Sequence, residues 1–233
     1  MRNFTLDGRL SSAAKFVRQG ARFADIGTDH AYLPIFLLRE GIIDYAVCSD
    51  INEGPLDSAR ENARLAGVSE KTDFTLANGA DALRDKNITD VAVCGMGGEL
   101  IADIVTRAEF LRKTGIRLIL QPMSKFAELR RTLYSLGYSV IDEEYSSAVG
   151  KLYVTLCAEY TADVRTASDE VAEFGEERFL KLKSPDQTEF LKRKRDALKR
   201  AALGKELGGE SSEKERRLYE YVNEILNCGG RKK

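Results

Sequence analysis

The chain is poor in the residues that build metal sites and covalent cross-links. It has one histidine and four cysteines in 233 residues. The cysteines lie far apart, and no two of them form a C-x-x-C pair: Cys48, Cys94, Cys157 and Cys228. Because zinc sites need closely spaced sets of these ligands, we expect no metal and reduced thiols.

The sequence also lacks long apolar runs and an excess of charge of one sign. No stretch approaches the roughly 20 apolar residues that span a bilayer, and the N-terminus has no charged-then-apolar signal segment. The 36 basic and 37 acidic side chains leave a formal net charge of −1. We therefore expect a cytoplasmic protein without membrane contact, with a monomer favoured, in which any binding of nucleic acid depends on a local basic patch.

Up to residue 160, short apolar strands alternate with amphipathic helices. The apolar pattern predicts strands at residues 22–26, 45–49, 73–76, 90–94 and 116–120. It predicts helices between them at residues 31–40, from Pro55 onward, and at 98–107 and 125–136. Two consecutive strands at 138–145 and 151–160 then form a hairpin. This order predicts a Rossmann-like α/β sheet, mostly parallel with one antiparallel strand, which is typical of class I methyltransferases.

Beyond residue 160 the signals for strands disappear. Pro185 separates two helical stretches at residues 164–183 and 186–206, which predicts an antiparallel helical hairpin. A final helix follows residues 208–212, with apolar residues from Leu218 to Ile225 at helical spacing. We therefore divide the chain into an α/β domain over residues 1–160 and a helical, coiled-coil-like domain over residues 161–233.

The turn after the first strand has one glycine where dinucleotide-binding folds have three. Between Asp25 and His30 the only glycine is Gly27, which Thr28 follows. Asp29 lies where a second glycine would admit a pyrophosphate. A carboxylate at position 29 repels phosphate but favours a sulfonium cation. This turn predicts S-adenosylmethionine as the cofactor in preference to NAD or ATP.

Three further strand ends border the expected cofactor site. Asp50 ends the second strand, next to Ile51, and can accept hydrogen bonds from a ribose or cap the following helix. After the third strand, Asn78-Gly79-Ala80 can contact an adenine edge or form an ordinary turn before a helix. After the fourth strand, three neighbouring residues let a ligand approach the backbone closely: Gly95, Met96 and Gly97.

Several residues at this edge have more than one interpretation. The fourth strand ends in Cys94-Gly-Met-Gly-Gly98, not in the Asn/Asp-Pro-Pro-aromatic motif of many adenine-N6 methyltransferases, which argues against exocyclic-amine chemistry. Gln121 and Pro122 end the fifth strand at the same rim. His30 is either a general base or a hydrogen-bonding or packing residue, and we include it among the expected cofactor contacts. Cys94 has no basic neighbour to make it a nucleophile.

A basic run marks the second helix of the expected hairpin. Six basic side chains and one acidic residue occupy nine positions, with the basic ones at Lys192, Arg193, Lys194, Arg195, Lys199 and Arg200. The run is either a solvated helix face or a stripe that follows a phosphate backbone.

Together, Asp25-Ile-Gly-Thr-Asp-His-Ala-Tyr-Leu-Pro34, Cys94-Gly-Met-Gly-Gly98 and Leu120-Gln-Pro122 resemble the bacterial tRNA (adenine-22-N1)-methyltransferase family. The early segment Leu6-Asp-Gly-Arg-Leu10, which contains Arg9, resembles the N-terminal helix of that family, and the tail resembles its coiled-coil-like domain. The resemblance implies S-adenosylmethionine as cofactor and tRNA as substrate. It also implies substrate contacts by Arg9, Gln121 and Pro122 and by the basic run.

The expected reaction needs no base to create its nucleophile, since neutral adenine N1 already carries a lone pair. Attack on the sulfonium methyl group moves positive charge onto the adenine, and we expect Asp29 to stabilise that charge as the catalytic residue. The adenine must first leave its stack or be presented by a distortion of the tRNA. Two other functions stay open from the sequence, a nucleotide-dependent oxidoreductase and a non-catalytic RNA-binding protein.

Overall fold

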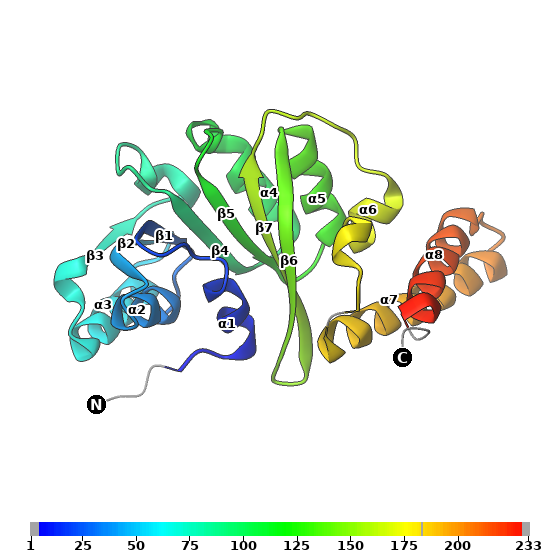
Figure 1. Ribbon diagram of the computed structural model, residues 1–233, viewed down its shortest axis with the longest axis horizontal. Coiled ribbons are helices and arrows are strands. Elements are labelled where there is room, and N and C mark those ends of the chain that lie inside the picture. Colours follow the sequence, from blue (N-terminus) through cyan, green and yellow to red (C-terminus); the bar gives the residue numbers. More distant parts are fainter. Residues whose placement is uncertain (1–4, 183, 230–233) are drawn as a thin grey trace.

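A twisted sheet of seven strands forms the centre of the computed structural model, which describes residues 5–182 and 184–229 (Figure 1). The strands are β1 (Ala21–Ile26), β2 (Ile43–Asp50), β3 (Thr72–Leu76), β4 (Asp90–Met96), β5 (Arg117–Pro122), β6 (Tyr138–Ala148) and β7 (Lys151–Tyr160). Their order is β3-β2-β1-β4-β5-β7-β6. β1 to β5 pair in parallel, and β7 is antiparallel to both β5 and β6. The predicted parallel sheet with one antiparallel strand is confirmed.

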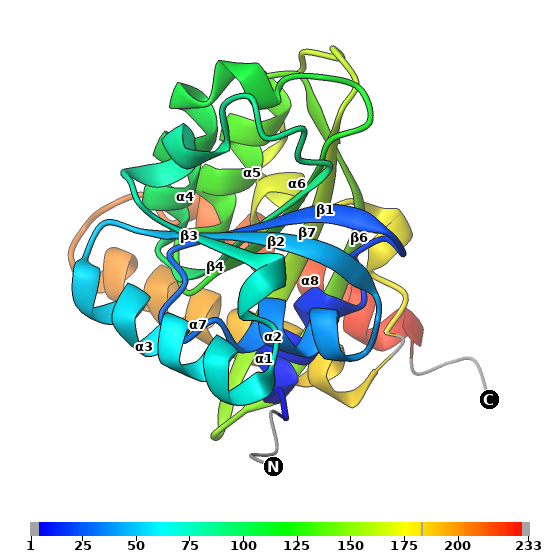
Figure 2. The ribbon, with the colours of Figure 1, turned by 90° about the vertical axis from the view of Figure 1, so that its left-hand side faces the viewer.

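Helices cover both faces of the sheet, as the alternating pattern predicted. On one side lie α1 (Gly8–Ala14), α2 (Tyr32–Arg39) and α3 (Glu53–Ala66), and on the other lie α4 (Gly98–Arg107) and α5 (Phe126–Ser135) (Figure 2). Each side has its own buried apolar cluster. Fully burying one leucine or isoleucine contributes about 1.5–3 kcal/mol, so these two clusters supply the main stabilisation of the α/β layers. Short 3₁₀ helices lie at η1 (Ser69–Lys71), η2 (Gly79–Leu83), η3 (Glu109–Leu111) and η4 (Glu177–Phe179).

The prediction of a helical hairpin divided by Pro185 is wrong. Between residues 161 and 182 the structure has only the short helix α6 (Asp169–Phe174) and η4. Buried Phe174 and Phe179 hold this segment against the α/β core, which overrides its helical pattern. Pro185 instead starts the long helix α7 (Pro185–Leu207), where its missing N–H does no harm, and the Ser184 hydroxyl caps the helix by accepting from the Gln187 N–H.

The helical hairpin of the C-terminal region consists of α7 and α8 (Glu213–Gly229), joined by residues 208–212. The predicted final helix is confirmed, and its Leu218 and Val222 are buried against the rest of the protein. A fully buried ion pair lies where α6 packs on the sheet domain: Arg130 of α5 donates to both carboxylate oxygens of Glu143 in β6 at 2.9 Å. The same guanidinium donates to the Ala172 carbonyl in α6 at 3.0 Å, so α5, β6 and α6 are held together.

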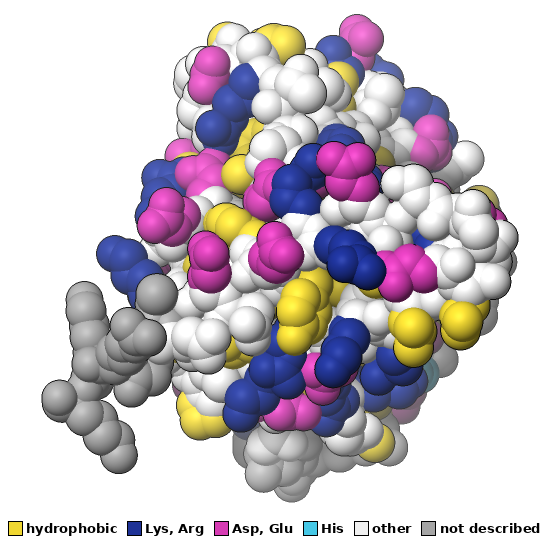
Figure 3. Space-filling view, turned by 90° about the vertical axis from the view of Figure 1, so that its right-hand side faces the viewer, with side chains coloured by type: hydrophobic (Ala, Val, Ile, Leu, Met, Phe, Trp, Pro, Cys, Tyr) yellow, Lys and Arg dark blue, Asp and Glu magenta, His cyan; other side chains and the backbone are white. Residues whose placement is uncertain are grey.

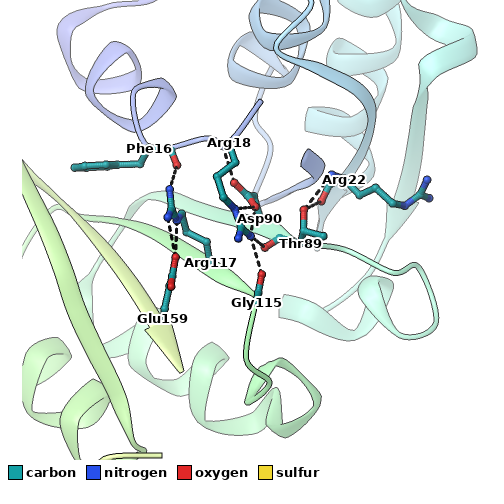
Figure 4. Close-up of polar contacts among 8 residues, drawn as sticks. All are labelled: Phe16, Arg18, Arg22, Thr89, Asp90, Gly115, Arg117 and Glu159. Atoms are coloured by element: carbon teal, nitrogen blue, oxygen red, sulfur yellow. Dashed lines mark hydrogen bonds and ion pairs between the residues drawn. The ribbon is translucent and has the colours of Figure 1, made fainter. Parts of the chain in front are cut away.

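A second buried carboxylate fixes the amino ends of the strands (Figure 4). Asp90, at the start of β4, is fully buried and accepts from the backbone N–H and the Nε of Arg18, both at 2.9 Å. The Arg18 guanidinium also donates to the carbonyls of Thr89 and Gly115 at 2.7 Å. Both charges therefore have complete sets of partners at this edge, which is the edge opposite the ligand-binding one.

Among residues 5–182 and 184–229, no helix combines the length and the apolar character that crossing a bilayer requires.

Candidate active site

A cavity of about 650 Å³ opens at the carboxyl ends of β1, β2 and β4. Open α/β sheets bind their ligands at this edge, and the volume lies in the usual range for small-molecule sites. The acidic and basic side chains that line it are Asp7, Arg9, Asp25, Asp29, His30 and Asp50. Four carboxylates and one guanidinium give the cavity a negative character that suits a cationic ligand.

The turn after β1 requires glycine at position 27. Gly27 has φ +74°, and its N–H and that of Thr28 both donate to the carbonyl of Ser49 on β2, at 2.8 and 3.0 Å. A Cβ on Gly27 would lie 2.0 Å from the terminal methyl carbon of Met96. The turn is therefore compact, and β4 touches it through Met96, so Gly27, Met96 and Gly95 line the same cavity.

Asp25 is a buried carboxylate with few compensating partners. Its side chain accepts from the Thr28 hydroxyl at 2.6 Å, and the residue is 8% exposed. Burial raises the pKa of the Asp25 carboxyl to about 6, and the nearby Asp50 charge adds to the rise, while the Thr28 hydrogen bond and Arg9 oppose it. Because burial disfavours the ionised form of this carboxyl, a ligand that brings a hydrogen-bond donor or a cation would stabilise it.

Asp50 lies both at the entrance to α3 and at the cavity, so its contact with a ribose stays a prediction. One of its carboxylate oxygens accepts from the Asn52 N–H at 2.8 Å, at the entrance to α3, and the residue also lines the cavity. Asn52 occupies the N-cap position but makes no capping hydrogen bond with its side chain. Within the part of the chain that the structure describes, the second oxygen of Asp50 has no hydrogen-bond partner. The neighbouring Ile51 side chain is exposed at the same strand end.

Asp29 and His30 lie at the mouth of the cavity. The Asp29 side chain is 77% exposed, and its carboxylate is 3.4 Å from Nε2 of His30. The His30 ring packs at 5.3 Å, centroid to centroid, on Tyr32, which is also exposed and lines the cavity. The exposure of Asp29 means that water screens its charge until a substrate covers the mouth.

Arg9 approaches the site from α1 on the opposite wall. Its Nη1 donates to Oε1 of Gln121 at 3.3 Å, and the same oxygen accepts from the Gly95 N–H at 3.1 Å. Gln121 is fully buried, and its amide nitrogen donates to the Pro122 carbonyl at 2.9 Å. Neither Gln121 nor Pro122 therefore lines the cavity. We expect Gln121 to affect a substrate through the orientation of Arg9. Met123, the next residue, does line the cavity.

Other predicted cofactor residues lie outside the main cavity. Asn78 and Ala80, with Gly79 between them, border a separate small hollow next to Ile104 and Arg107. Gly97 is the N-cap of α4 and does not line the cavity. Thr28 is buried and acts through its hydrogen bond to Asp25. The structure thus brings together the residues after β1, β2 and β4, and separates those after β3.

Sequence reasoning missed part of the lining. Asp7 lies in the N-terminal segment that carries Arg9, and Tyr32 lies in the turn motif itself, so both were within reach of the motifs. Tyr153 lies near the start of β7, where nothing in the local pattern separates it from an ordinary buried strand residue. Only the fold brings Tyr153 to this cavity.

The basic run lies on α7, and its members differ in how they are paired. Arg193 pairs with Glu189 at 2.8 Å, Lys194 with Glu173 at 3.1 Å, and Arg195 with Asp196 at 2.8 Å. The other three have no carboxylate partner within the described part of the chain and are exposed: Lys192, Lys199 and Arg200. Figure 3 shows basic and acidic side chains interspersed on the end of the molecule that carries this hairpin. Carboxylates of the described part of the chain thus neutralise only three of the six positive charges in the basic run.

Within the described ranges, no group of three or more His, Cys, Asp or Glu side chains is arranged to hold a metal ion. Burial raises the pKa of the Cys94 thiol far above its usual range, so this cysteine is not poised as a thiolate nucleophile.

Comparison with known proteins identifies the family. A methyltransferase domain family matches residues 6–156. The tRNA (adenine(22)-N(1))-methyltransferase of Bacillus subtilis is 33% identical over 159 residues, which is 68% of this chain and 67% of that protein.

Solved structures agree over nearly the whole chain. A Streptococcus pneumoniae protein described as a candidate tRNA (m1A22) methyltransferase is 31% identical, with a TM-score of 0.84, over 95% of this chain and 100% of that one. The complex of that protein with S-adenosyl-L-methionine is 32% identical, with a TM-score of 0.80, over 94% and 98% of the two chains. The chain belongs to the methyltransferase domain family and, within it, to the tRNA (adenine-22-N1)-methyltransferases.

Proposed function

We propose that this protein transfers a methyl group from S-adenosylmethionine to N1 of adenine 22 in tRNA. The observation that carries the proposal is the glycine-backed cavity at the carboxyl edge of the sheet, where Asp25, Asp29 and Asp50 converge. The Streptococcus complex, a relative that binds S-adenosyl-L-methionine, supports the cofactor. The Bacillus relative supports the base and its position in tRNA.

The residues of the cavity fit this cofactor. S-adenosylmethionine supplies an electrophilic methyl group on a cationic sulfonium. Asp50 has a carboxylate oxygen available for ribose hydroxyls, and Asp25 offers a buried acceptor for a cationic or donor group. Gly27 and Gly95 allow close approach to the backbone. A diphosphate fits poorly because several carboxylates, not Asp29 alone, would repel it, and this disfavours the oxidoreductase alternative.

We assign to Asp29 the stabilisation of charge on the methylated adenine. Its carboxylate lies at the mouth, where an extruded base would arrive, and 3.4 Å from His30. Methylation at N1 makes the adenine cationic, so a fixed negative charge beside it lowers the barrier. Because Asp29 is mostly exposed, this effect grows when the tRNA covers the mouth and excludes water. Contacts to the cofactor from Ile51, Asn78, Gly79, Ala80 and Gly97 stay predictions.

We also propose that residues 161–233 hold the tRNA. Lys192, Lys199 and Arg200 offer exposed charges to phosphate groups, and the paired members of the run can exchange partners on binding. A tRNA substrate further favours action in the cytoplasm. That the protein acts as a monomer stays a prediction.

A transfer assay tests the function directly. Purified protein is incubated with methyl-labelled S-adenosylmethionine and an unmodified tRNA. One portion of the tRNA is digested to nucleosides to identify the labelled nucleoside, and an intact portion is mapped by primer extension. We expect labelled 1-methyladenosine and a stop at position 22. No transfer under conditions in which the protein binds S-adenosylmethionine would favour the non-catalytic alternative, and a label at another atom or position would contradict the proposed acceptor.

A further inference from the structure

The β6–β7 hairpin ends in a turn whose first central residue has an unfavourable conformation. Ala148 pairs with Lys151, so the loop consists of Val149 and Gly150, with φ +48° and +71°. Two-residue turns with both φ values positive favour Asn-Gly or Asp-Gly, and positive φ in a β-branched residue is a genuine outlier. No other β-branched residue in the described ranges has a positive φ.

Val149 is also the most exposed of the large apolar residues in the described part of the chain. Val149 is 96% exposed, and its neighbours Ser147, Gly150 and Lys151 are exposed as well. No acidic residue lies between Ser146 and Lys151. The tip thus presents one apolar group with a single cation beside it. An asparagine at position 149 would satisfy the turn at no cost to burial, so the requirement of the fold does not account for a valine there.

The tip projects past the sheet at the edge where the active-site cavity opens. Figure 1 shows the β6–β7 hairpin extending below the carboxyl ends of the parallel strands, between α1 and α7. Tyr153 of the same hairpin lines the cavity, four residues from Val149. At about 3.3 Å per residue, four strand positions span roughly 13 Å, which is close to four steps between stacked bases.

The hairpin is held rigidly from both sides. On the side of the cavity, α1 packs so closely that a Cβ on Gly8 would lie 2.2 Å from the Ser147 carbonyl oxygen, and the Ser12 and Thr155 hydroxyls form a buried hydrogen bond of 2.7 Å. On the other side, the ring of Phe190 in α7 packs at 5.3 Å against Tyr145 of β6. The tip therefore has a fixed position between the cavity and the helix with the basic run.

We propose that Val149 is a contact for the bases of the tRNA, and that it packs on the base face exposed when the target adenine leaves its stack. Proteins that unstack or kink nucleic acids use exposed apolar side chains in this way, and the lost stacking is the energy that such a contact replaces. The rigid hairpin holds the side chain at a fixed distance from the mouth, and Lys151 can meet the adjacent phosphate. This inference rests on the proposed function.

The test is the variant Val149→Asn in the full-length protein, with Leu65→Asn as the matched control, because Leu65 is also an exposed apolar residue and lies in α3, away from the hairpin and from residues 161–233. We expect kcat/KM for tRNA methylation to fall about tenfold in V149N and to stay unchanged in L65N. S-adenosylmethionine affinity should be equal in all three proteins. The Tm of V149N should equal or exceed that of the wild type, because asparagine suits the turn. Val149→Leu, which keeps the apolar group, should retain most activity.

A fluorescence measurement separates base contact from a general loss of binding. A tRNA with 2-aminopurine next to the target adenine should brighten when the wild type binds, and brighten less with saturating V149N. Full activity and full brightening with V149N would overturn the role of Val149. Sedimentation showing a wild-type dimer that V149N cannot form would overturn it too, since the tip would then contact a second copy. A wild type that does not methylate tRNA at all contradicts the proposed function itself.

Discussion

Asp90 and Asp25 are buried carboxylates at opposite edges of one sheet, and they differ in how many hydrogen-bond donors surround them. Asp90 is fully buried and is surrounded by the backbone N–H and guanidinium of Arg18 (Figure 4). Asp25 has one hydroxyl donor, Thr28, and burial raises its pKa to about 6. The sheet thus completes the hydrogen bonding of one acid and leaves the other incomplete.

This difference distinguishes the charge of Asp90, which stabilises the fold, from the charge of Asp25, which we expect to bind a ligand. A buried charge without full compensation costs stability, and a protein retains such a charge where a ligand completes it. Asp50 at the same edge is only partly buried, and one of its oxygens accepts from the Asn52 N–H. We therefore expect the amino edge to contribute to the stability of the fold, and the carboxyl edge, with its negative cavity, to contribute to binding and chemistry.

The largest effect is expected on stability, from Asp90→Ala. The change leaves the Arg18 guanidinium without its carboxylate, and removing one partner of a buried ion pair typically costs about 3–5 kcal/mol. Because Arg18 is partly exposed, water can solvate its unpaired charge. We therefore expect the free energy of unfolding, measured by urea titration, to fall by about 3 kcal/mol, the lower end of this range. S-adenosylmethionine affinity, measured by calorimetry below the unfolding transition, should not change. An affinity loss without a loss of stability would reverse the roles of the two edges.

Asp29→Ala should have the largest effect on catalysis. Removing one group that stabilises charge in a transition state costs about a hundredfold in kcat. We expect that loss in single-turnover methylation of tRNA, with cofactor affinity within about tenfold of the wild type, since Asp29 lies at the mouth and is exposed. Asp44→Ala, an exposed acid at the other end of β2, is the matched control and should remain fully active. Intact turnover with weakened cofactor binding would show that Asp29 serves the cofactor instead.

Asp25 predicts a dependence on pH around 6. Its folded-state pKa lies above the ordinary value of 3.8, so the folded protein without ligand binds the proton more tightly than the unfolded chain does between about pH 4 and 6. The contribution of Asp25 to stability therefore falls as the pH rises through this window. Affinity for the cationic cofactor should do the opposite and weaken up to about tenfold per unit below pH 6, because protonation removes the charge.

Asp25→Asn is the test of that titration. The variant should lose both slopes, and calorimetry and thermal unfolding at pH 5, 6 and 7 would record them. Unchanged slopes in the variant would assign the titration to another group.

The smallest effect is expected from the basic run. Reversing the three exposed and unpaired members, Lys192, Lys199 and Arg200, should weaken tRNA binding about tenfold at moderate salt and reduce the slope of log K against log salt. Reversing the paired residues Arg193 and Arg195 is the comparison and should weaken binding less, because they already have carboxylate partners. Filter binding across a salt series measures both sets. Equal affinity of the triple variant and the wild type would make the run a solvated surface.

Much of the α/β domain could be predicted from the sequence because buried strands and one-sided helices leave local periodic patterns. The edge that carries Asp25, Asp29 and Asp50 followed from those strands, since parallel strands present their carboxyl ends together. What failed depended on contacts distant in the sequence. The segment around Phe174 has a helical pattern, but its burial beside Arg130 and Glu143 makes it a mostly irregular connection. The burial of Gln121 and the partners of the basic run depend on the same kind of contact.

The most direct test of the account is a calorimetric titration of the wild type and Asp50→Ala with S-adenosylmethionine and with NADH. The account predicts that the wild type binds S-adenosylmethionine and shows no measurable heat with NADH. It predicts that Asp50→Ala loses about tenfold or more in affinity, as expected for a hydrogen bond to a charged acceptor. Tight binding of NADH to the wild type, or undiminished S-adenosylmethionine binding to Asp50→Ala, would contradict a cavity whose carboxylates select a cationic methyl donor.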